Sequence, residues 1–322
     1  MSGRLFLGID TSNYTTSAAV ADEDGEVLLN HKSPLPVPDG ARGLRQSDAV
    51  FHHVKNLPAA AAALRGVLDA LDRRRIAAIG VSAAPRAAEG SYMPCFLAGV
   101  AAAETAGAAL GVPVLRFSHQ AGHVMAALCS ANAMHLLGGE FAAFHVSGGT
   151  TDVLLARPSD EAILGVEKIG GTRDINAGQA IDRAGVYMGL QFPAGAEMER
   201  LAAAYTGALP RAAISVDGLE CNLSGLENRA RQLYDETGDR AAVSAFVLDF
   251  VARTLCALRD GVRARVGSIP ILYAGGVMSC RRLADALAEP GAYFARPAFS
   301  SDNAAGAALL ARARVLREEG SV

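Results

Sequence analysis

Apolar and polar residues occur in short alternating blocks at the start of the chain. Residues 4–9 are mostly apolar, residues 10–17 are small and polar, residues 18–21 are apolar, and residues 22–26 form an acidic turn. Short apolar blocks bounded by turn-forming residues are typical of buried β-strands. The pattern therefore predicts a strand, a polar turn, a second strand, an acidic turn and a third strand.

The same pattern returns in the middle of the chain. Residues 141–170 repeat the order of an apolar strand, a small polar turn, two threonines and an apolar strand. Internal similarity of this kind predicts two domains built on one plan. Turns made of serine, threonine, glycine and asparagine expose backbone N–H groups that can bind phosphates. Either turn alone is explained as well by an ordinary β-hairpin, but the duplication favours a site that holds a polyphosphate between two domains.

Strand and helix patterns alternate after a loop rich in proline and glycine at residues 33–43. This alternation predicts a mostly parallel sheet covered by helices. We therefore expect an α/β fold with an N-terminal domain at residues 1–136, on which a C-terminal helix at residues 303–322 packs. A second α/β domain is expected at residues 137–302, with a helical insertion at residues 176–266.

Composition narrows the class of protein. The chain has 322 residues, of which 51% are hydrophobic, and a formal net charge of −3. That charge argues against strong nucleic-acid binding by the chain alone, because such proteins carry a basic surface. The five cysteines form no Cys-x-x-Cys pair and indicate reduced thiols in a cytoplasmic protein. No membrane span is expected, since Glu104 and Pro113 interrupt the most apolar long run.

Two histidines four positions apart, His119 and His123, stand at the start of an apolar-periodic segment. On a helix they share one face, so both rings could bind one divalent metal ion. Zinc peptidases of the His-Glu-x-x-His type use this spacing but need the glutamate as general base, and Gln120 stands there instead. Two surface histidines without a chemical role are the alternative. His52 and His53 are weaker candidates, expected on a helix that faces solvent.

A third glycine turn follows a buried strand near the end of the chain. Gly275 and Gly276 end an apolar run and lead into a helical pattern. A helix N-terminus at the carboxyl end of a strand is a common position for a nucleotide or an anion. Together with the two hairpin turns, this turn predicts a nucleotide site.

Five stretches, in their order and spacing, resemble the threonylcarbamoyl-adenosine tRNA-modification transferase family (TsaD-type, formerly called glycoproteases or O-sialoglycoprotein endopeptidases). They are LGIDTS, SHQAGH, VSGGT, AGQAIDRAGVYMGLQFPAGAEMERLA, and AGGV with RRL followed by SSDNAA. The resemblance covers essentially the whole chain and identifies it as a divergent member. It implies the duplicated ATPase fold of actin, hexokinase and the chaperones, with two domains flanking a nucleotide cleft.

The resemblance also implies roles for individual residues. His119, His123 and Asp302 would be the catalytic group and bind one divalent metal ion, iron or zinc, that polarises the carbamoyl carbonyl. An ATP or adenylate-type nucleotide would bind as substrate. Its contacts would come from Val146, Ser147, Gly148, Gly149, Thr150, Asp182, Gly195, Glu199, Gly275, Gly276 and Cys280.

The implied reaction is transfer of a threonylcarbamoyl group from its adenylate to an adenosine in the anticodon loop of tRNA. The implied partners are tRNA and further proteins of a modification complex, and a homo- or heterodimer is an expected assembly. Peptidase activity is not expected, because Gln120 cannot take up a proton as a glutamate would.

The sequence departs from the family's pattern at several polar positions. Thr150 stands where a histidine is common, Ile175 and Gln179 where carboxylates are expected, Cys280 where an asparagine is usual, and Glu227 where a lysine is usual. Two alternatives follow from these departures. The chain could be a divergent paralogue that acts as a different carbamoyl or acyl transferase, or a non-catalytic nucleotide-binding partner.

Overall fold

The protein divides into two compact units, each described here by itself. The structure is a computed structural model that describes residues 3–12, 14–37, 44–71, 75–296 and 304–320. The first unit takes its described residues from 1–138, 157–166 and 301–322, and the second from 139–156 and 167–300.

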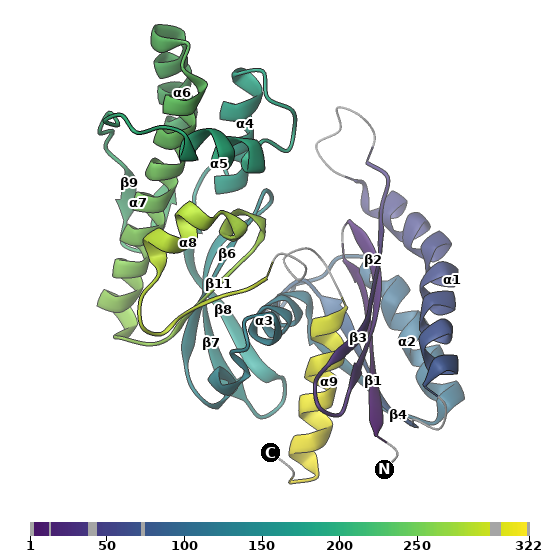
Figure 1. Cartoon of the computed structure of the whole chain (residues 1–322). Coiled ribbons are helices and arrows are strands. Elements are labelled where there is room, and N and C mark those ends of the chain that lie inside the picture. The colour runs from purple at the N-terminus through teal and green to yellow at the C-terminus, as the bar shows by residue number, and fades with distance from the viewer. Residues whose placement is uncertain (1–2, 13, 38–43, 72–74, 297–303, 321–322) are drawn as a thin grey trace. The chain divides into compact units, whose positions relative to one another are not determined.

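The first unit is built on a five-stranded sheet with the order β3-β2-β1-β4-β5 (Figure 1). The first three strands run antiparallel, while β4 pairs parallel with β1, and β5 pairs parallel with β4. Its elements are β1 (Arg4–Ser12), β2 (Thr15–Asp22), β3 (Val27–Pro34), α1 (Gln46–Ala70), β4 (Arg75–Ala84), α2 (Phe96–Leu110), β5 (Val114–Ser118), α3 (His119–Ser130), the 3-10 helix η1 (Met134–Gly138) and α9 (Ala305–Glu318).

Helices cover both faces of this sheet, and the alternation of side chains along β1 decides which helix lies on which face. Leu5, Leu7 and Ile9 belong to an apolar cluster with residues of α1 and α2. Gly8 faces the opposite side, where α9 approaches so closely that an added Cβ would lie 2.1 Å from the carbonyl oxygen of Ala304. Figure 1 shows α9 on one side of the sheet and α1 and α2 on the other.

The second unit repeats this plan. Its sheet has the order β12-β11-β6-β7-β8-β10-β9, so that β8-β7-β6-β11-β12 corresponds strand for strand to β3-β2-β1-β4-β5. The duplication predicted from the sequence is thereby confirmed. The elements are β6 (Phe141–Val146), β7 (Thr151–Ser159), β8 (Ile163–Thr172), α4 (Ala177–Tyr187), α5 (Gly195–Ala203), β9 (Ser215–Asp217), β10 (Glu220–Asn222), α6 (Ser224–Thr237), α7 (Arg240–Val266), β11 (Ile271–Ala274), the 3-10 helix η2 (Gly276–Ser279), α8 (Arg281–Leu287) and β12 (Ala292–Phe294).

Helix α7 is the central helix of the second unit. It has 27 residues, and in its most apolar window 72% of the residues are buried inside the protein. Among the described residues it is the one helix whose length and composition would suffice to cross a membrane. Its buried side chains, among them Phe246, Phe250 and Leu255, belong to the main apolar cluster of this unit. The burial therefore identifies α7 as a core helix.

Two local features differ from the sequence expectation. The insertion expected to be helical contains the short strand pair β9 and β10, joined by a turn at Gly218. Strands of three residues are too short to show a hydrophobic period. Residues 157–166, which are the end of β7, the start of β8 and the turn between them, are expected in the second domain but group with the first unit, although both strands lie in the second unit's sheet. Side chains of α9 account for this, since Arg314 and Arg317 donate hydrogen bonds to backbone carbonyls in that segment.

We predict that Gly80→Ala destabilises the first unit. An added Cβ at Gly80 would lie 2.0 Å from the carbonyl oxygen of Ala307, so α9 would have to move away from β4. Overpacking of this kind costs about 1–3 kcal/mol of unfolding free energy. Thermal unfolding followed by circular dichroism measures the loss.

Gly66→Ala is the matched control. Gly66 lies in α1, and an added Cβ there meets nothing within 4 Å. Alanine in an exposed helical position is expected to stabilise by about 0.5–1 kcal/mol. Equal changes in unfolding free energy for Gly80→Ala and Gly66→Ala would contradict the close contact between α9 and the sheet.

Candidate functional site

The first unit brings the two predicted histidines together on α3. Ser118 caps the helix by accepting a hydrogen bond from the N–H of Ala121 at 3.1 Å, and His119 is the first helical residue. His123 lies one turn later, with its ring centroid 4.3 Å from that of His119. The two Nε2 atoms are 2.9 Å apart. The expected helix with both rings on one face is therefore present.

A buried carboxylate fixes the orientation of His119. Asp10 on β1 is 1% exposed, and its Oδ2 lies 2.8 Å from Nδ1 of His119. Ser82 on β4 donates to the same oxygen, while the N–H of Ser12 donates to Oδ1 at 2.8 Å. An ionised carboxylate only accepts hydrogen bonds, so Nδ1 of His119 carries a proton, and in the neutral form of the ring the lone pair then lies on Nε2. This arrangement is the one that metal-binding histidines commonly show.

Opposing effects act on the pKa of Asp10. Burial by itself raises this pKa, but the charge of His119 and the hydrogen bonds from His119, Ser12 and Ser82 outweigh it and hold the pKa below its usual value. The carboxylate is thus kept ionised inside the protein. Sequence reasoning gave Asp10 no role, although an acidic residue directly after an apolar run was a visible signal.

The third predicted metal ligand, Asp302, lies outside the described residues. Within the described ranges, no group of three or more histidine, cysteine, aspartate or glutamate side chains is arranged to hold a metal ion. Asp10 does not complete such a group, because it binds Nδ1 of His119, on the side of the ring away from His123.

The expectation that His53 faces solvent is wrong. The side chain is fully buried, and its Nδ1 lies 2.8 Å from the hydroxyl of Thr16. Asn56, one turn along α1, donates to the same hydroxyl at 3.3 Å. Burial lowers the pKa of His53, so the ring is held in its neutral form. It acts as a polar anchor between α1 and β2.

In the second unit, the predicted glycine turn is a tight hairpin between β6 and β7. The N–H of Ser147 donates to the carbonyl of Thr150 at 2.7 Å, and Val146 pairs with Thr151. Gly148 and Gly149 are exposed, and added Cβ atoms there would meet nothing within 4 Å. The exposed backbone of the turn is therefore accessible to a ligand.

Two close glycine contacts hold other predicted segments against this turn. An added Cβ at Gly178, in the first turn of α4, would lie 2.6 Å from the Cα of Gly148. An added Cβ at Gly275 would lie 2.2 Å from the carbonyl oxygen of Val146. The N–H of Gly178 also donates to the carbonyl of Ser147 at 3.2 Å. The hairpin, the start of α4 and the turn after β11 thus form one cluster.

The predicted acidic residues each bind the start of a helix. Asp182 on α4 accepts from the N–H of Ala194, next to Gly195, at 2.8 Å. Glu199 on α5 accepts from the N–H of Arg281, next to Cys280, at 2.6 Å. These two contacts connect α4, α5 and α8. Burial raises the pKa of Asp182, and the hydrogen bond from Ala194 opposes that shift.

The cluster of the hairpin, the start of α4 and the turn after β11 is called the nucleotide half-site below, and two of its details correct the sequence expectation. The turn at Gly275 and Gly276 does not lead directly into an α-helix, because the 3-10 helix η2 intervenes and α8 begins only at Arg281. The first N–H group of α8 already binds Glu199, so it is not available to an anion. Burial also raises the pKa of the Cys280 thiol, which is therefore kept neutral.

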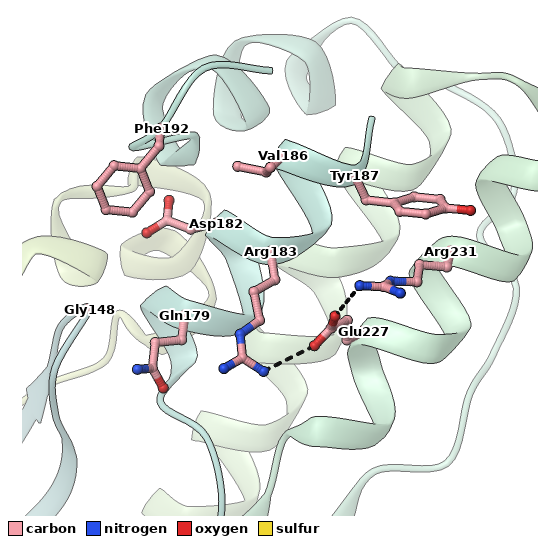
Figure 2. A pocket seen from close by; sticks show the side chains of 9 residues that line it. All are labelled: Gly148, Gln179, Asp182, Arg183, Val186, Tyr187, Phe192, Glu227 and Arg231. Carbon is pink, nitrogen blue, oxygen red and sulfur yellow. Dashed lines mark hydrogen bonds and ion pairs between the residues drawn. The ribbon is translucent and has the colours of Figure 1, made fainter. Parts of the chain in front are cut away.

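Two of the substituted positions have defined structural roles. The side-chain oxygen of Gln179 accepts from the N–H of Asn176 at 3.1 Å and completes a capping box at the start of α4. Glu227 on α6 forms ion pairs with Arg183, on α4, and with Arg231, one turn further along α6. Both residues line a cavity of about 560 Å³ that also includes Gly148 and Asp182 (Figure 2).

The sequence is similar to known proteins of one family. The model of a family described as TsaD, tRNA N6-adenosine threonylcarbamoyltransferase, matches residues 41–309. The protein of that name from Streptococcus pneumoniae (strain Taiwan19F-14) is 30% identical over 302 residues, which cover 89% of this chain and 84% of the relative. The one from Streptococcus mutans serotype c is 31% identical over 301 residues, covering 90% of this chain and 84% of that protein.

Solved structures share the fold at low identity. Full-length HypF in its phosphate- and nucleotide-bound form has a TM-score of 0.60 and 12% identity, covering 98% of this chain and 46% of HypF. A ROK family glucokinase from Streptomyces griseus with glucose and AMPPNP has a TM-score of 0.52 and 14% identity, covering 96% of this chain and 99% of the glucokinase. The fold is therefore that of the actin- and hexokinase-like ATPases.

We predict that Asp174→Asn lowers the free energy of unfolding of the second unit and makes its decrease in acid less steep. The carboxylate of Asp174 accepts from the N–H groups of Leu223 and Ser224 at the start of α6. Burial alone would raise its pKa, but these bonds and that from Ile175 lower it from 3.8 to about 2. Because the folded-state pKa is depressed, this stability is present above about pH 4 and is lost as the pH falls towards 2.

Urea unfolding between neutral pH and pH 2 measures the effect. The variant is expected to lose about 1 kcal/mol at neutral pH, as for other helix caps, and to show a shallower decline in acid. Asp69→Asn, in the last turn of α1, changes the charge equally and serves as control. Parallel acid curves for the wild type and Asp174→Asn would refute the capping role.

Proposed function

The chain belongs to the tRNA N6-adenosine threonylcarbamoyltransferase family, and on this premise we propose that it transfers a threonylcarbamoyl group from its adenylate to an anticodon-loop adenosine. Members of this family act in the biosynthesis of threonylcarbamoyladenosine in tRNA. The observation that carries the proposal is the imidazole pair of His119 and His123, with Nε2 atoms 2.9 Å apart and the far nitrogen of His119 bound to buried Asp10.

The donor atoms of this pair suit a divalent metal ion such as zinc or iron. Two imidazoles that share one ion at bond lengths of about 2.0–2.1 Å hold their nitrogens about 2.8–3.4 Å apart for angles between 90° and tetrahedral, and the observed 2.9 Å lies within that range. Because Nδ1 of His119 is bound to Asp10, Nε2 is the nitrogen of this ring that would bind the ion. His119 and His123 would hold the ion, and we assign the third ligand to Asp302.

When bound, such an ion would supply Lewis acidity to the carbonyl of the group being transferred. Residues of the protein would orient the ligands of the ion and bind the nucleotide. Asp10 holds the ring of His119 in one orientation and one tautomer. In the second unit, the exposed backbone of Gly148 and Gly149 would bind phosphate oxygens, as such turns commonly do. Asp182 uses one carboxylate oxygen for Ala194, and its second oxygen would accept a hydrogen bond from a ribose hydroxyl.

Peptidase chemistry does not fit the residue at the position of the general base. Gln120 follows His119, and its neutral amide cannot take up a proton from water at neutral pH. The acceptor is therefore proposed to be the amino group of an adenosine, as the names of the relatives state for those proteins. With a net charge of −3, the chain would bind tRNA together with partner proteins in the cytoplasm.

We predict that the full chain modifies tRNA in a reconstituted reaction. The mixture contains tRNA, threonine, bicarbonate, ATP and candidate partner proteins, and nucleoside mass spectrometry detects the product. His123→Ala is expected to lower the yield at least about a hundredfold, since a metal at the reacting carbonyl is worth several kcal/mol. Adenylate turnover without any need for tRNA would instead indicate a different acceptor, and no product with any partner would reject the proposal.

A second prediction concerns the metal itself. His119→Ala is expected to lose metal binding and Asp10→Asn to weaken it by about 10–100-fold, because outer partners of ligating histidines tune affinity to that extent. Competition with a zinc-binding dye measures the affinity, and circular dichroism checks the fold. His52→Ala, with its ring against Phe51 on α1, is the control histidine and should bind metal as the wild type does. Unfolding of His119→Ala together with metal loss would mean that the ion is structural.

A further inference from the structure

A groove between α4 and α6 extends from the glycine hairpin of the second unit. It is part of the cavity of about 560 Å³, a volume within the range of about 300–1,000 Å³ that small-molecule pockets have. Gly148 and Asp182 belong to the half-site described above, but the rest of the lining extends beyond it (Figure 2). The lining residues are Gly148, Gln179, Asp182, Arg183, Val186, Tyr187, Phe192, Glu227 and Arg231.

Exposed apolar side chains gather at this groove. Among the described residues of the second unit, the exposed large hydrophobic side chains are Val186, Tyr187 and Phe192, and all three line the groove. Phe192 is 75% exposed, although it stands beside a core that buries most other aromatic rings. Single exposed apolar residues need no explanation, but their concentration around one hollow indicates a binding surface.

The groove presents flat groups in fixed positions. The guanidinium of Arg231 lies over the ring of Tyr187, with its central carbon 4.8 Å from the ring centroid. The hydroxyl of Tyr187 donates to Asp235 at 2.7 Å, and Arg231 is held by its ion pair with Glu227. Ordering these side chains on binding therefore costs little entropy, and they suit a flat ligand that can stack.

The charges of the groove balance. Glu227 forms ion pairs with Arg183 and Arg231, which Figure 2 shows as dashed lines, and Asp182 adds a second carboxylate. Two positive and two negative side chains leave no net charge to attract a phosphate. The groove therefore fits a neutral, flat group with hydrogen-bonding edges better than it fits a phosphate or another charged group.

We propose that this groove binds an unstacked base of the acceptor RNA. Proteins that read single-stranded RNA stack its bases on aromatic rings and arginine planes and bind the base edges by hydrogen bonds. Tyr187 and Phe192 supply the rings, and the side-chain amide of Gln179 lies within the same lining. The choice of RNA as the ligand rests on the proposed function, since the groove adjoins the nucleotide half-site through Gly148 and Asp182.

The test measures binding of a short RNA hairpin whose loop carries a fluorescent purine analogue. Stacking quenches such an analogue, and anisotropy of an end label gives the affinity. The full chain is used alone and in the reconstituted mixture. Tyr187→Ala and Phe192→Leu are each expected to weaken binding about tenfold and to reduce the quenching, since base stacking on one ring is commonly worth that factor.

Three comparisons make the result specific. Tyr187→Phe keeps the ring but loses the bond to Asp235, and it is expected to restore binding relative to Tyr187→Ala. Phe51→Ala removes an aromatic ring that is 60% exposed on α1 of the first unit, and it should bind RNA as the wild type does. Thermal unfolding of each variant shows whether the fold is kept.

The outcomes separate the groove from the proposed reaction. The groove proposal is overturned if Tyr187→Ala and Phe192→Leu modify tRNA and bind the RNA hairpin as the wild type does. The proposed transfer reaction is kept in that case. If neither the wild type nor any variant modifies tRNA, but binding of the RNA hairpin still depends on the two rings, the proposed reaction is rejected and the groove proposal is kept. Ring-dependent binding of a partner protein, with no effect on RNA, would also overturn the groove proposal.

Discussion

The hydrogen bonds to the buried carboxylate of Asp10 decide the geometry of the first unit's site. A charge removed from water is costly unless it is paired and hydrogen-bonded. Asp10 meets this condition through Ser12 on its own strand, Ser82 on β4 and His119 at the start of α3. Two neighbouring strands and a helix are thus joined at one side chain. Because the carboxylate must be satisfied, the ring of His119 cannot rotate freely, and its Nε2 points to His123.

In the second unit, carboxylates have a related role at the ends of helices. Asp174 binds the first N–H groups of α6, Asp182 binds the N–H at the cap of α5, and Glu199 binds the first N–H of α8. Unpaired N–H groups at a helix start attract negative charge. Two of these carboxylates were expected to contact a nucleotide. The structure shows that the three carboxylates together connect α4, α5, α6 and α8. Loss of one of them would therefore shift more than one helix of the half-site.

Local sequence patterns were sufficient for the duplicated fold and for the histidine pair. The repeated order of strand, polar turn and strand needs only neighbouring residues, and so does the spacing that puts His119 and His123 on one helix face. Asp10 and His119 are 109 positions apart, and Arg183 and Glu227 are 44 positions apart. Contacts of this length depend on the tertiary fold. The burial of His53 was missed for the same reason, since its partner Thr16 lies on a different element.

Two of the positions at which the sequence departs from the family's pattern lie at one location. Gln179 and Glu227 depart from the family's usual residues, and both line the groove between α4 and α6. Gln179 still completes the capping box of α4, and Glu227 forms ion pairs with both arginines of the groove and, together with Asp182, balances their charge. The imidazole pair, by contrast, keeps the residue types that the family pattern requires. If the groove receives the acceptor, divergence in this chain has therefore changed how the acceptor is held while the groups nearest the proposed transfer step were retained.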